Sequence, residues 1–224
     1  MTSPIKAAAV LWDLDGTLVE SEGYWALAEQ SLSKRYPGTW THEDGLALTG
    51  LSLPVSCAIM REKMGIDDIS VDEMIQELTD GVLFHMQDGM AWRPGALELA
   101  TRLHHAGVPQ AIVTMSIRRM ALAVRDAAHE ATGLEIFELV VAGDEVTNGK
   151  PHPEAFLTAA ERLGVAPENC VAIEDSLNGL TSAEAAGTKA LGVPFVVELP
   201  PIPGRNIWPT LVDVEPHHLN ELFD

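Results

Sequence analysis

The chain has 224 residues, of which 46% are hydrophobic and 21% are charged, and its formal net charge is −19 at pH 7. This composition is typical of a folded globular protein with a substantial core. So strong a negative charge disfavours binding to nucleic acids and to anionic lipid surfaces, and an anionic substrate would need a local cation to attract it.

The cysteines and the hydropathy of the sequence indicate the cellular compartment. The two cysteines, Cys57 and Cys170, lack the paired spacing of zinc and redox motifs, so we expect reduced thiols. No segment supplies the roughly 20 consecutive apolar residues that a membrane helix needs. We therefore expect a cytoplasmic protein that binds neither membranes nor nucleic acids. A monomer is the simpler expectation for its oligomeric state.

Short apolar runs recur along the chain and predict a parallel sheet. They lack the polar alternation of half-exposed strands, which is typical of strands that are covered on both faces. The runs lie at 7–13, 110–114, 139–143 and 170–175, with weaker candidates at 188–194 and 211–214.

Helical patterns lie between these runs. They span 95–108, 153–165 and 178–188, and Gly107, Gly164 and Gly187 are placed to end them. Alternating strands and helices predict βαβ units, and therefore an α/β fold with a Rossmann-like parallel sheet flanked by helices.

The segment 20–92 differs from the rest of the chain. Its patterns are helical, without a convincing strand between them, and the turn signal "WRPG" follows at 92–95. We interpret it as an all-helical cap domain inserted into a core domain made of 1–19 and 93–224. Hinges are expected at 19–21 and 92–95, whereas the proline-rich stretch 198–209 is predicted to be irregular.

Polar side chains follow four of the predicted strands. They are Asp13 and Asp15 after the first, Thr114 and Ser116 after the second, Lys150 after the third, and Glu174 and Asp175 at the end of the fourth. Because ligand sites in parallel sheets form at the carboxyl ends of strands, these groups are expected to share one edge.

Such a cluster suits phosphoryl chemistry. Carboxylates at one edge repel each other unless a cation lies among them, and oxygen ligands without histidine favour Mg²⁺. The Lys150 ammonium, the hydroxyls of Thr114 or Ser116 and the N–H groups of 14–17 can hold phosphate oxygens. One carboxylate can attack phosphorus to form an aspartyl-phosphate, while a second exchanges protons with the leaving oxygen and with water.

Four ordered motifs carry a resemblance to a known family. "DLDGTLVES", "VTMS", "GKPHPEAF" and "IEDSLNGL" resemble the four motifs of the haloacid dehalogenase (HAD) superfamily, and the helical insert resembles its first type of cap. The resemblance implies that Asp13 is the nucleophile and that Asp15 is the general acid/base, which also offers its backbone carbonyl to Mg²⁺. It also implies that Thr114 binds phosphate and that Lys150 stabilises charge.

The metal ligands follow from the same resemblance, and the substrate contacts follow from the chemistry of the residues. The resemblance implies metal ligands at Asp13, Asp15, Glu174 and Asp175, with Glu174 acting directly or through water. Substrate contacts are expected from Gly16, Thr17, Ser116 and Trp25.

Some of these residues have alternative roles. Ser116 could instead cap the next helix. Glu174 and Asp175 could complement a helix N-terminus, with Ser176 as its cap. The eight histidines are interpreted as structural or solvated.

Within the superfamily, the cap resembles that of the β-phosphoglucomutase-like subgroup, with "LTGLS" at 48–52 and "WRPG" as matching motifs. The mutases carry a histidine where this chain has Trp25 and an arginine where it has Leu53. The resemblance therefore favours a Mg²⁺-dependent phosphatase that hydrolyses a small phosphorylated metabolite, preferably with one phosphate. A sugar phosphomutase and a catalytically idle phosphoryl-binding module are the alternatives.

Overall fold

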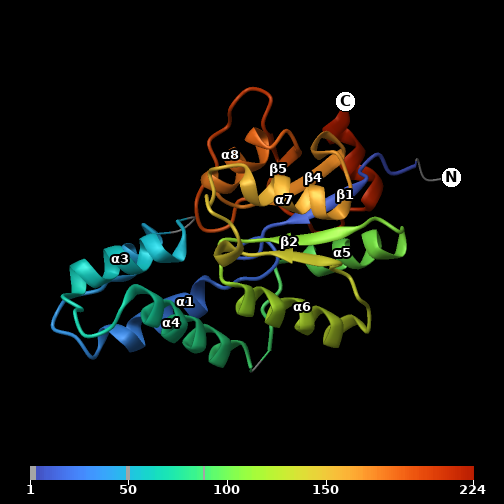
Figure 1. The fold of residues 1–224 in the computed structure, drawn as a ribbon. Helices are drawn as coiled ribbons and strands as arrows, with labels where there is room; N and C mark the ends of the chain where they lie inside the picture. The colour runs from blue at the N-terminus through green and yellow to red at the C-terminus, as the bar shows by residue number, and fades with distance from the viewer. Residues whose placement is uncertain (1–3, 49–50, 88) are drawn as a thin grey trace.

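A computed structural model of the chain describes residues 4–48, 51–87 and 89–224 (Figure 1). Within these residues, six parallel strands form one sheet in the order β3-β2-β1-β4-β5-β6. The strands are β1 (Ala9–Trp12), β2 (Gln110–Val113), β3 (Leu139–Val141), β4 (Cys170–Glu174), β5 (Lys189–Gly192) and β6 (Asn206–Ile207). This order confirms the predicted α/β fold and puts β1 and β4, which carry most of the acidic groups, side by side.

Five of the predicted strands form, and the sixth was wrong. The run 211–214 is a turn, because the Val214 N–H bonds to the Leu211 carbonyl at 3.2 Å and Asp213 has a φ of +60°. Leu211 and Val214 are buried, so the apolar pattern reflected packing of a turn against the core. The edge strand β6 lies within 198–209 instead, in the stretch that was expected to be irregular.

Helices cover both faces of the sheet (Figure 1). Successive β1 residues alternate between two cores: Val10 and Trp12 pack on the side of α5 (Ala96–His105) and α6 (Arg118–Thr132), and Ala9 and Leu11 pack on the other. The second face is covered by α7 (Glu154–Leu163) and α8 (Leu177–Ala185). Every side chain of β1 is therefore buried, as the apolar run predicted.

Local signals explain where the helices end. Gly164 closes α7 in the left-handed conformation, with a φ of +69°, as the sequence predicted. Gly107 and Gly187 also have positive φ, one residue beyond the C-caps of α5 and α8. The short 3₁₀ helices are η1 (Gly143–Glu145), η2 (Pro167–Asn169) and η3 (Pro216–Phe223).

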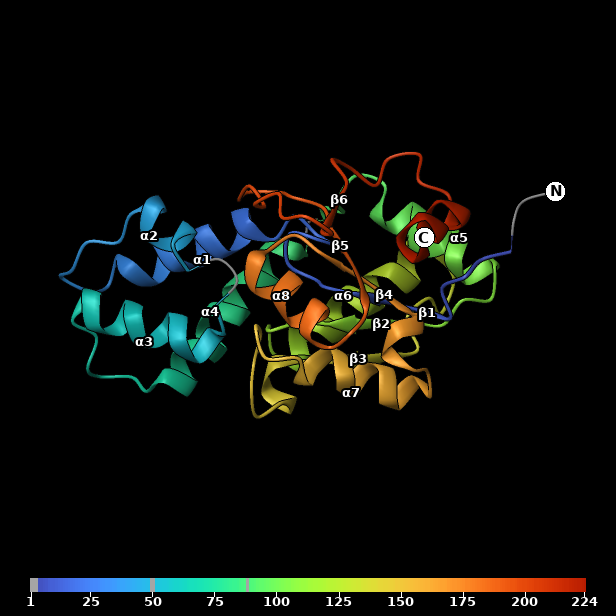
Figure 2. The ribbon, with the colours of Figure 1, turned by 90° about the horizontal axis from the view of Figure 1, so that it is seen from above.

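Four helices follow β1 and gather beside the carboxyl ends of the strands (Figure 2). They are α1 (Glu22–Ser33), α2 (His42–Leu46), α3 (Leu53–Met64) and α4 (Val71–Met86). α1 packs closely on α4, where Gly81 leaves room for the Ala28 methyl group. Residues 49–50 of the "LTGLS" motif lie outside the described residues.

The two chain segments that join these helices to the sheet run next to each other. The Glu20 N–H donates to the Ala91 carbonyl at 2.7 Å, and the Arg93 N–H donates to the Leu18 carbonyl at 2.9 Å. Paired linkers of this kind support our proposal that 20–92 is a cap domain, with 1–19 and 93–224 as the core and hinges at the linkers. In the part of the chain that the structure describes, no helix has the length and apolarity of a membrane span.

Candidate active site

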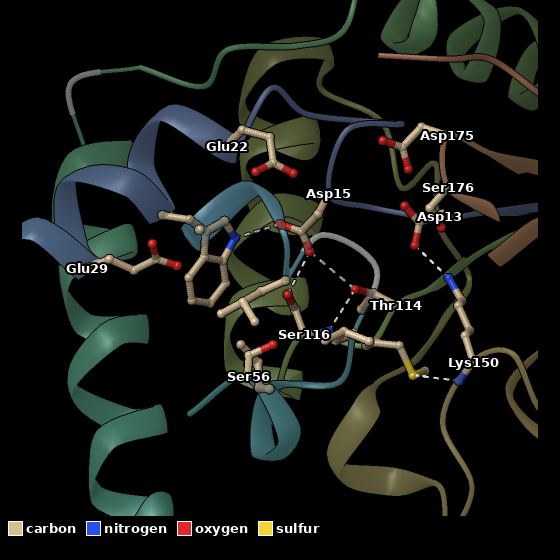
Figure 3. Close-up of a pocket in the computed structure, with 16 residues that line it drawn as sticks. Asp13, Asp15, Glu22, Glu29, Ser56, Thr114, Ser116, Lys150, Asp175 and Ser176 are labelled. Carbon is tan, nitrogen blue, oxygen red and sulfur yellow. Dashed lines mark hydrogen bonds and ion pairs between the residues drawn. The ribbon is translucent and has the colours of Figure 1, made fainter. Parts of the chain in front are cut away.

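A cavity of about 120 Å³ lies between the carboxyl ends of the central strands and the cap helices (Figure 3). Most of the sequence-predicted polar residues line it, together with cap residues. The sheet edge contributes Asp13, Asp15, Thr114, Ser116, Lys150 and Asp175, and the cap contributes Glu22, Trp25, Glu29, Leu51, Leu53 and Ser56.

The loop after β1 brings its backbone close to a second acidic segment. The Asp13 N–H continues the sheet by bonding to the Ile173 carbonyl at 3.0 Å. Gly16 then turns the chain with a φ of +80°, and a Cβ atom there would lie 2.1 Å from Oδ2 of Asp175. A glycine is required because both the positive φ and the close approach exclude a side chain.

Lys150 is the fixed cation of the site. Its Nζ donates to Oδ1 of Asp13 and to Oε1 of Glu174, each at 2.6 Å, and to the Val113 carbonyl at 2.8 Å. Only 3% of its side chain is exposed. Burial alone would lower the pKa of Lys150, but the two carboxylates outweigh it and raise this pKa above its usual range. The lysine therefore stays charged.

Asp13, Glu174 and Asp175 form a buried acidic cluster whose ligand oxygens lie within 4.8 Å of one another. Burial, reinforced by the Glu174 charge, raises the pKa of Asp13 to about 7 although Lys150 opposes the rise. Burial, followed by the charges of Asp13 and Glu174, also raises the pKa of Asp175. One ammonium thus faces three carboxylates, and the oxygen-only donor set suits a hard divalent cation such as Mg²⁺.

The oxygens of Glu174 are already bound by protein donors. Oε1 accepts from Lys150, and Oε2 accepts from the Ser176 N–H at 3.2 Å and from its hydroxyl at 3.0 Å. Gly179 makes room for this carboxylate, since a Cβ there would come within 1.8 Å of it. Asp13 and Asp175 are therefore the better direct ligands for a cation, with Glu174 better suited to bind it through water.

Ser176 caps the helix after β4, as the sequence alternative expected. Its hydroxyl accepts the Gly179 N–H at 3.0 Å as the N-cap of α8, in addition to its bonds with Glu174. Ser116 is not the cap of the next helix, because Ile117 is the N-cap of α6. The Ser116 hydroxyl donates instead to Asp15 at 2.6 Å.

The Asp15 carboxylate points away from the acidic cluster and accepts hydrogen bonds at both oxygens (Figure 3). Its Oδ1 accepts from the Ser21 hydroxyl at 2.5 Å and from the Trp25 indole N–H at 3.0 Å. Its Oδ2 accepts from Ser116 and, at 3.5 Å, from Thr114. The acid/base role of this side chain stays a prediction, and so does the metal binding expected of the Asp15 backbone carbonyl.

Two predicted substrate contacts do not line the cavity. Gly16 is packed under Asp175, and the Thr17 side chain is buried. Their direct contact with substrate stays a prediction, whereas Ser116 and Trp25 do face the cavity.

Sequence reasoning missed two carboxylates of the cap wall. Glu22, Trp25 and Glu29 occupy positions i, i+3 and i+7 of α1 and therefore lie on one face of this helix. This spacing was the sequence signal that could have placed both carboxylates beside Trp25. Burial, with added repulsion from Asp15 and Glu29, raises the pKa of Glu22 to about 7. Burial also raises the pKa of Glu29, although the Trp40 indole N–H donates to it at 2.9 Å.

Comparison with known proteins shows which family the chain belongs to. The profile of the haloacid dehalogenase-like hydrolases matches residues 10–193. Hexitol phosphatase A of Escherichia coli is 32% identical over 207 residues, which cover 88% of this chain and 87% of that enzyme. The bifunctional riboflavin kinase/FMN phosphatase of Arabidopsis thaliana is 35% identical over 197 residues, or 87% of this chain, which spans only 51% of that longer protein.

The chain is also similar to proteins of known structure, one of which was crystallised with a bound ligand. CbbY of Rhodobacter sphaeroides, crystallised with xylulose-1,5-bisphosphate, is 27% identical with a TM-score of 0.81, over 92% of this chain and 96% of that one. A β-phosphoglucomutase of Clostridium difficile, at 20% identity and a TM-score of 0.80, shares the fold over 97% of both chains. The chain therefore belongs to the haloacid dehalogenase-like hydrolase family, as a phosphoric monoester hydrolase with a Rossmann-like core.

Proposed function

We propose that the chain hydrolyses a small, hydroxyl-bearing monophosphate ester in a Mg²⁺-dependent reaction through a phosphoryl intermediate on Asp13. The observation that carries this proposal is the buried contact of Lys150 with Asp13 beside a cluster of two further carboxylates. A carboxylate that is held in place next to a fixed cation can attack phosphorus, because the cation compensates the charge of the incoming phosphoryl group.

In the first step, a carboxylate oxygen of Asp13 bonds to phosphorus while the bond between phosphorus and the ester oxygen breaks. Lys150 remains beside Asp13 and offsets negative charge on the transferring group. The Thr114 hydroxyl, at the end of β2, binds a phosphoryl oxygen. Asp15 gives its proton to the departing ester oxygen, which leaves as an alcohol.

In the second step, water attacks phosphorus and the bond between phosphorus and Asp13 breaks. Asp15, now ionised, takes the proton of the attacking water and is ready for the next cycle. The two aspartates therefore divide nucleophilic and proton-transfer work between neighbouring positions of one loop.

The cation is assigned to the acidic cluster. Asp13 and Asp175 would hold it directly and Glu174 through water, since both Glu174 oxygens have protein donors. When bound, Mg²⁺ would neutralise the cluster and the phosphoryl oxygens. Its fit rests on the donor chemistry, in which three carboxylates face the single ammonium of Lys150.

The cavity wall supports a substrate with a single phosphate. Among its described lining residues Lys150 is the only cation, and the cap side carries Glu22 and Glu29 beside leucines. Carboxylates accept hydrogen bonds from hydroxyl groups but repel a second phosphate. We therefore infer a hydroxylated leaving group with no further anionic group.

The same wall disfavours a sugar phosphomutase. A mutase must hold a second phosphate in the cap, yet Leu53 lines the cavity at the position where the mutases of the resembling subgroup carry arginine. Trp25 likewise replaces their histidine and donates to Asp15.

The experiment is a kinetic comparison on the purified chain. We expect turnover of p-nitrophenyl phosphate and of hydroxylated monophosphates with Mg²⁺, loss of turnover with a chelator, and a loss of roughly 10³-fold or more in Asp13→Asn. Faster isomerisation of glucose 1-phosphate than hydrolysis would favour the mutase. Equal rates for the wild type and Asp13→Asn would support the idle module and contradict the proposal.

A further inference from the structure

The indole of Trp25 contacts the carboxylate of Asp15. The Trp25 N–H donates to Oδ1 of Asp15 at 3.0 Å, from a half-buried position on the first cap helix (Figure 3). The same oxygen accepts from Ser21, whose side chain is fully buried, at 2.5 Å. Oδ1 of Asp15 is thus held by the donors of Ser21 and Trp25, whereas Oδ2 faces Thr114 and Ser116 in the loop after β2.

The donors on the two oxygens differ in chemistry. The hydroxyls of Ser116 and Thr114, which face Oδ2, can rotate and either donate or accept. An indole N–H can only donate. An oxygen that carries a proton is a weak acceptor, so a fixed N–H at Oδ1 disfavours a proton on that oxygen and leaves Oδ2 as the oxygen that exchanges it.

We propose that Trp25 is a positioning residue that fixes the orientation of the Asp15 carboxyl, so that Oδ2 alone exchanges the proton with the leaving group and with water. This inference rests on the proposed function, in which Asp15 is the general acid and base. The proton passes from Oδ2 to the ester oxygen as the bond to phosphorus breaks. It returns to Oδ2 from the attacking water in the second step.

The chemistry of the leaving group distinguishes a role of Trp25 in proton transfer from a purely structural role. A p-nitrophenolate group departs without a proton, whereas an aliphatic alkoxide needs one. The value of kcat/KM reports the first irreversible step, which is phosphoryl transfer to Asp13. Loss of the indole N–H should therefore lower kcat/KM for an aliphatic phosphate and spare p-nitrophenyl phosphate.

The variants are Trp25→Phe and the chain with β-(3-benzothienyl)alanine at position 25, in which sulfur replaces the N–H while the ring shape is kept. We expect kcat/KM for glycerol phosphate to fall roughly tenfold or more in both, since misplaced proton-transfer groups lose much of their effect. For p-nitrophenyl phosphate we expect a change of less than about twofold. Trp208→Phe is the matched control, because Trp208 is also half-buried but does not line the cavity.

Each outcome separates the two proposals. Equal losses for both substrates in the benzothienyl protein, or no loss for glycerol phosphate, would overturn the role of Trp25 while leaving hydrolysis through Asp13 intact. If Trp25→Phe does not fold, the near-isosteric benzothienyl protein decides alone. Absence of turnover in the wild type, or full activity in Asp13→Asn, would instead reject the proposed function.

Discussion

Lys150 Nζ lies 2.6 Å from Oδ1 of Asp13, although 137 residues separate the two in the chain. The same ammonium contacts Glu174 at 2.6 Å, and all three side chains are buried. Burial of charged groups is costly unless they are paired and hydrogen-bonded. In this arrangement the ammonium and the carboxylates lie where an incoming phosphoryl group and a divalent cation would bind.

Replacing Lys150 should weaken both stability and turnover. We expect Lys150→Met to lose roughly 3–5 kcal/mol of folding free energy, because it leaves two buried carboxylates without their partner. Turnover should fall about 10²–10³-fold, as for loss of a positioned charge-stabilising group. Denaturant unfolding and steady-state kinetics measure the two effects.

Lys189→Met is the control, because Lys189 begins β5 and contacts the ring of Phe223, outside the cavity. Its turnover should match the wild type. A Lys150→Met protein with wild-type turnover would contradict the role assigned to the ammonium.

The Asp13 carboxyl should make stability depend on pH. Its pKa rises from 3.8 to about 7 on folding, so between about pH 4 and 7 the folded state binds more protons than the unfolded state. The free energy of unfolding therefore falls as pH rises through this window in the metal-free protein.

Asp13→Asn removes this titration and keeps the shape of the side chain. Without Mg²⁺ at pH 8, we expect the variant to be more stable than the wild type by about 1 kcal/mol or more, a rise in Tm of roughly 2–4 °C. Mg²⁺ should stabilise the wild type more than the variant. A variant with a lower Tm than the wild type in metal-free buffer at pH 8 would contradict the claim that the charge on Asp13 destabilises the metal-free fold.

Gly16→Ala should disturb the metal site through a steric clash. The added Cβ would lie 2.1 Å from the Asp175 carboxylate at a φ of +80°. Gly133→Ala is a matched control, because Gly133 has a φ of +71° but an added Cβ there meets open space. Both variants should lose about 1–2 kcal/mol from backbone strain.

Calorimetric titration with Mg²⁺ separates these two glycine variants. We expect a loss of affinity in Gly16→Ala and wild-type affinity in Gly133→Ala. Equal Mg²⁺ affinity in both would show that the close approach to Asp175 does not shape the site.

The cap carboxylates should set substrate preference. Glu22 is charged at pH 8, above its pKa of about 7, and Glu22→Gln keeps the shape but removes this charge. At that pH we expect kcat/KM for hydroxylated monophosphates to fall about tenfold, as for loss of a charged hydrogen-bond acceptor. The ratio of bisphosphate to monophosphate hydrolysis should rise, because less repulsion opposes the second phosphate. Glu98→Gln makes the same change at an exposed position on α5, and an identical substrate profile in both variants would refute the assignment.

The sequence predicted those parts of the molecule whose signals are local. Mostly apolar runs predicted the five longer strands, with β5 as a weaker candidate, and Gly164 predicted the end of α7, because both signals depend on nearby residues. The run 211–214 was misread, since a buried turn and a buried strand have the same apolar pattern. The short edge strand β6 has no such run and gave no signal.

The sequence predicted the site residues at the sheet edge, but it predicted fewer of those that the cap contributes. Parallel topology puts Asp13 and Glu174 side by side at the ends of β1 and β4, and it puts the loop that carries Lys150 at the same edge of the sheet, so the order of these residues along the chain was informative. Glu22 and the Trp25 contact with Asp15 depend on how α1 lies over the strand ends. That placement comes from tertiary packing, which sequence spacing does not encode.

The most direct test of the account is to trap the phosphoryl group on the enzyme. Wild-type protein would be mixed with p-nitrophenyl phosphate and Mg²⁺, quenched within milliseconds and reduced with borohydride, which converts an aspartyl-phosphate into homoserine. Peptide mass spectrometry should then find homoserine at position 13, and only when substrate is present. Product formation with an unmodified aspartate at position 13 in every quenched sample, or homoserine at another position, would contradict the account.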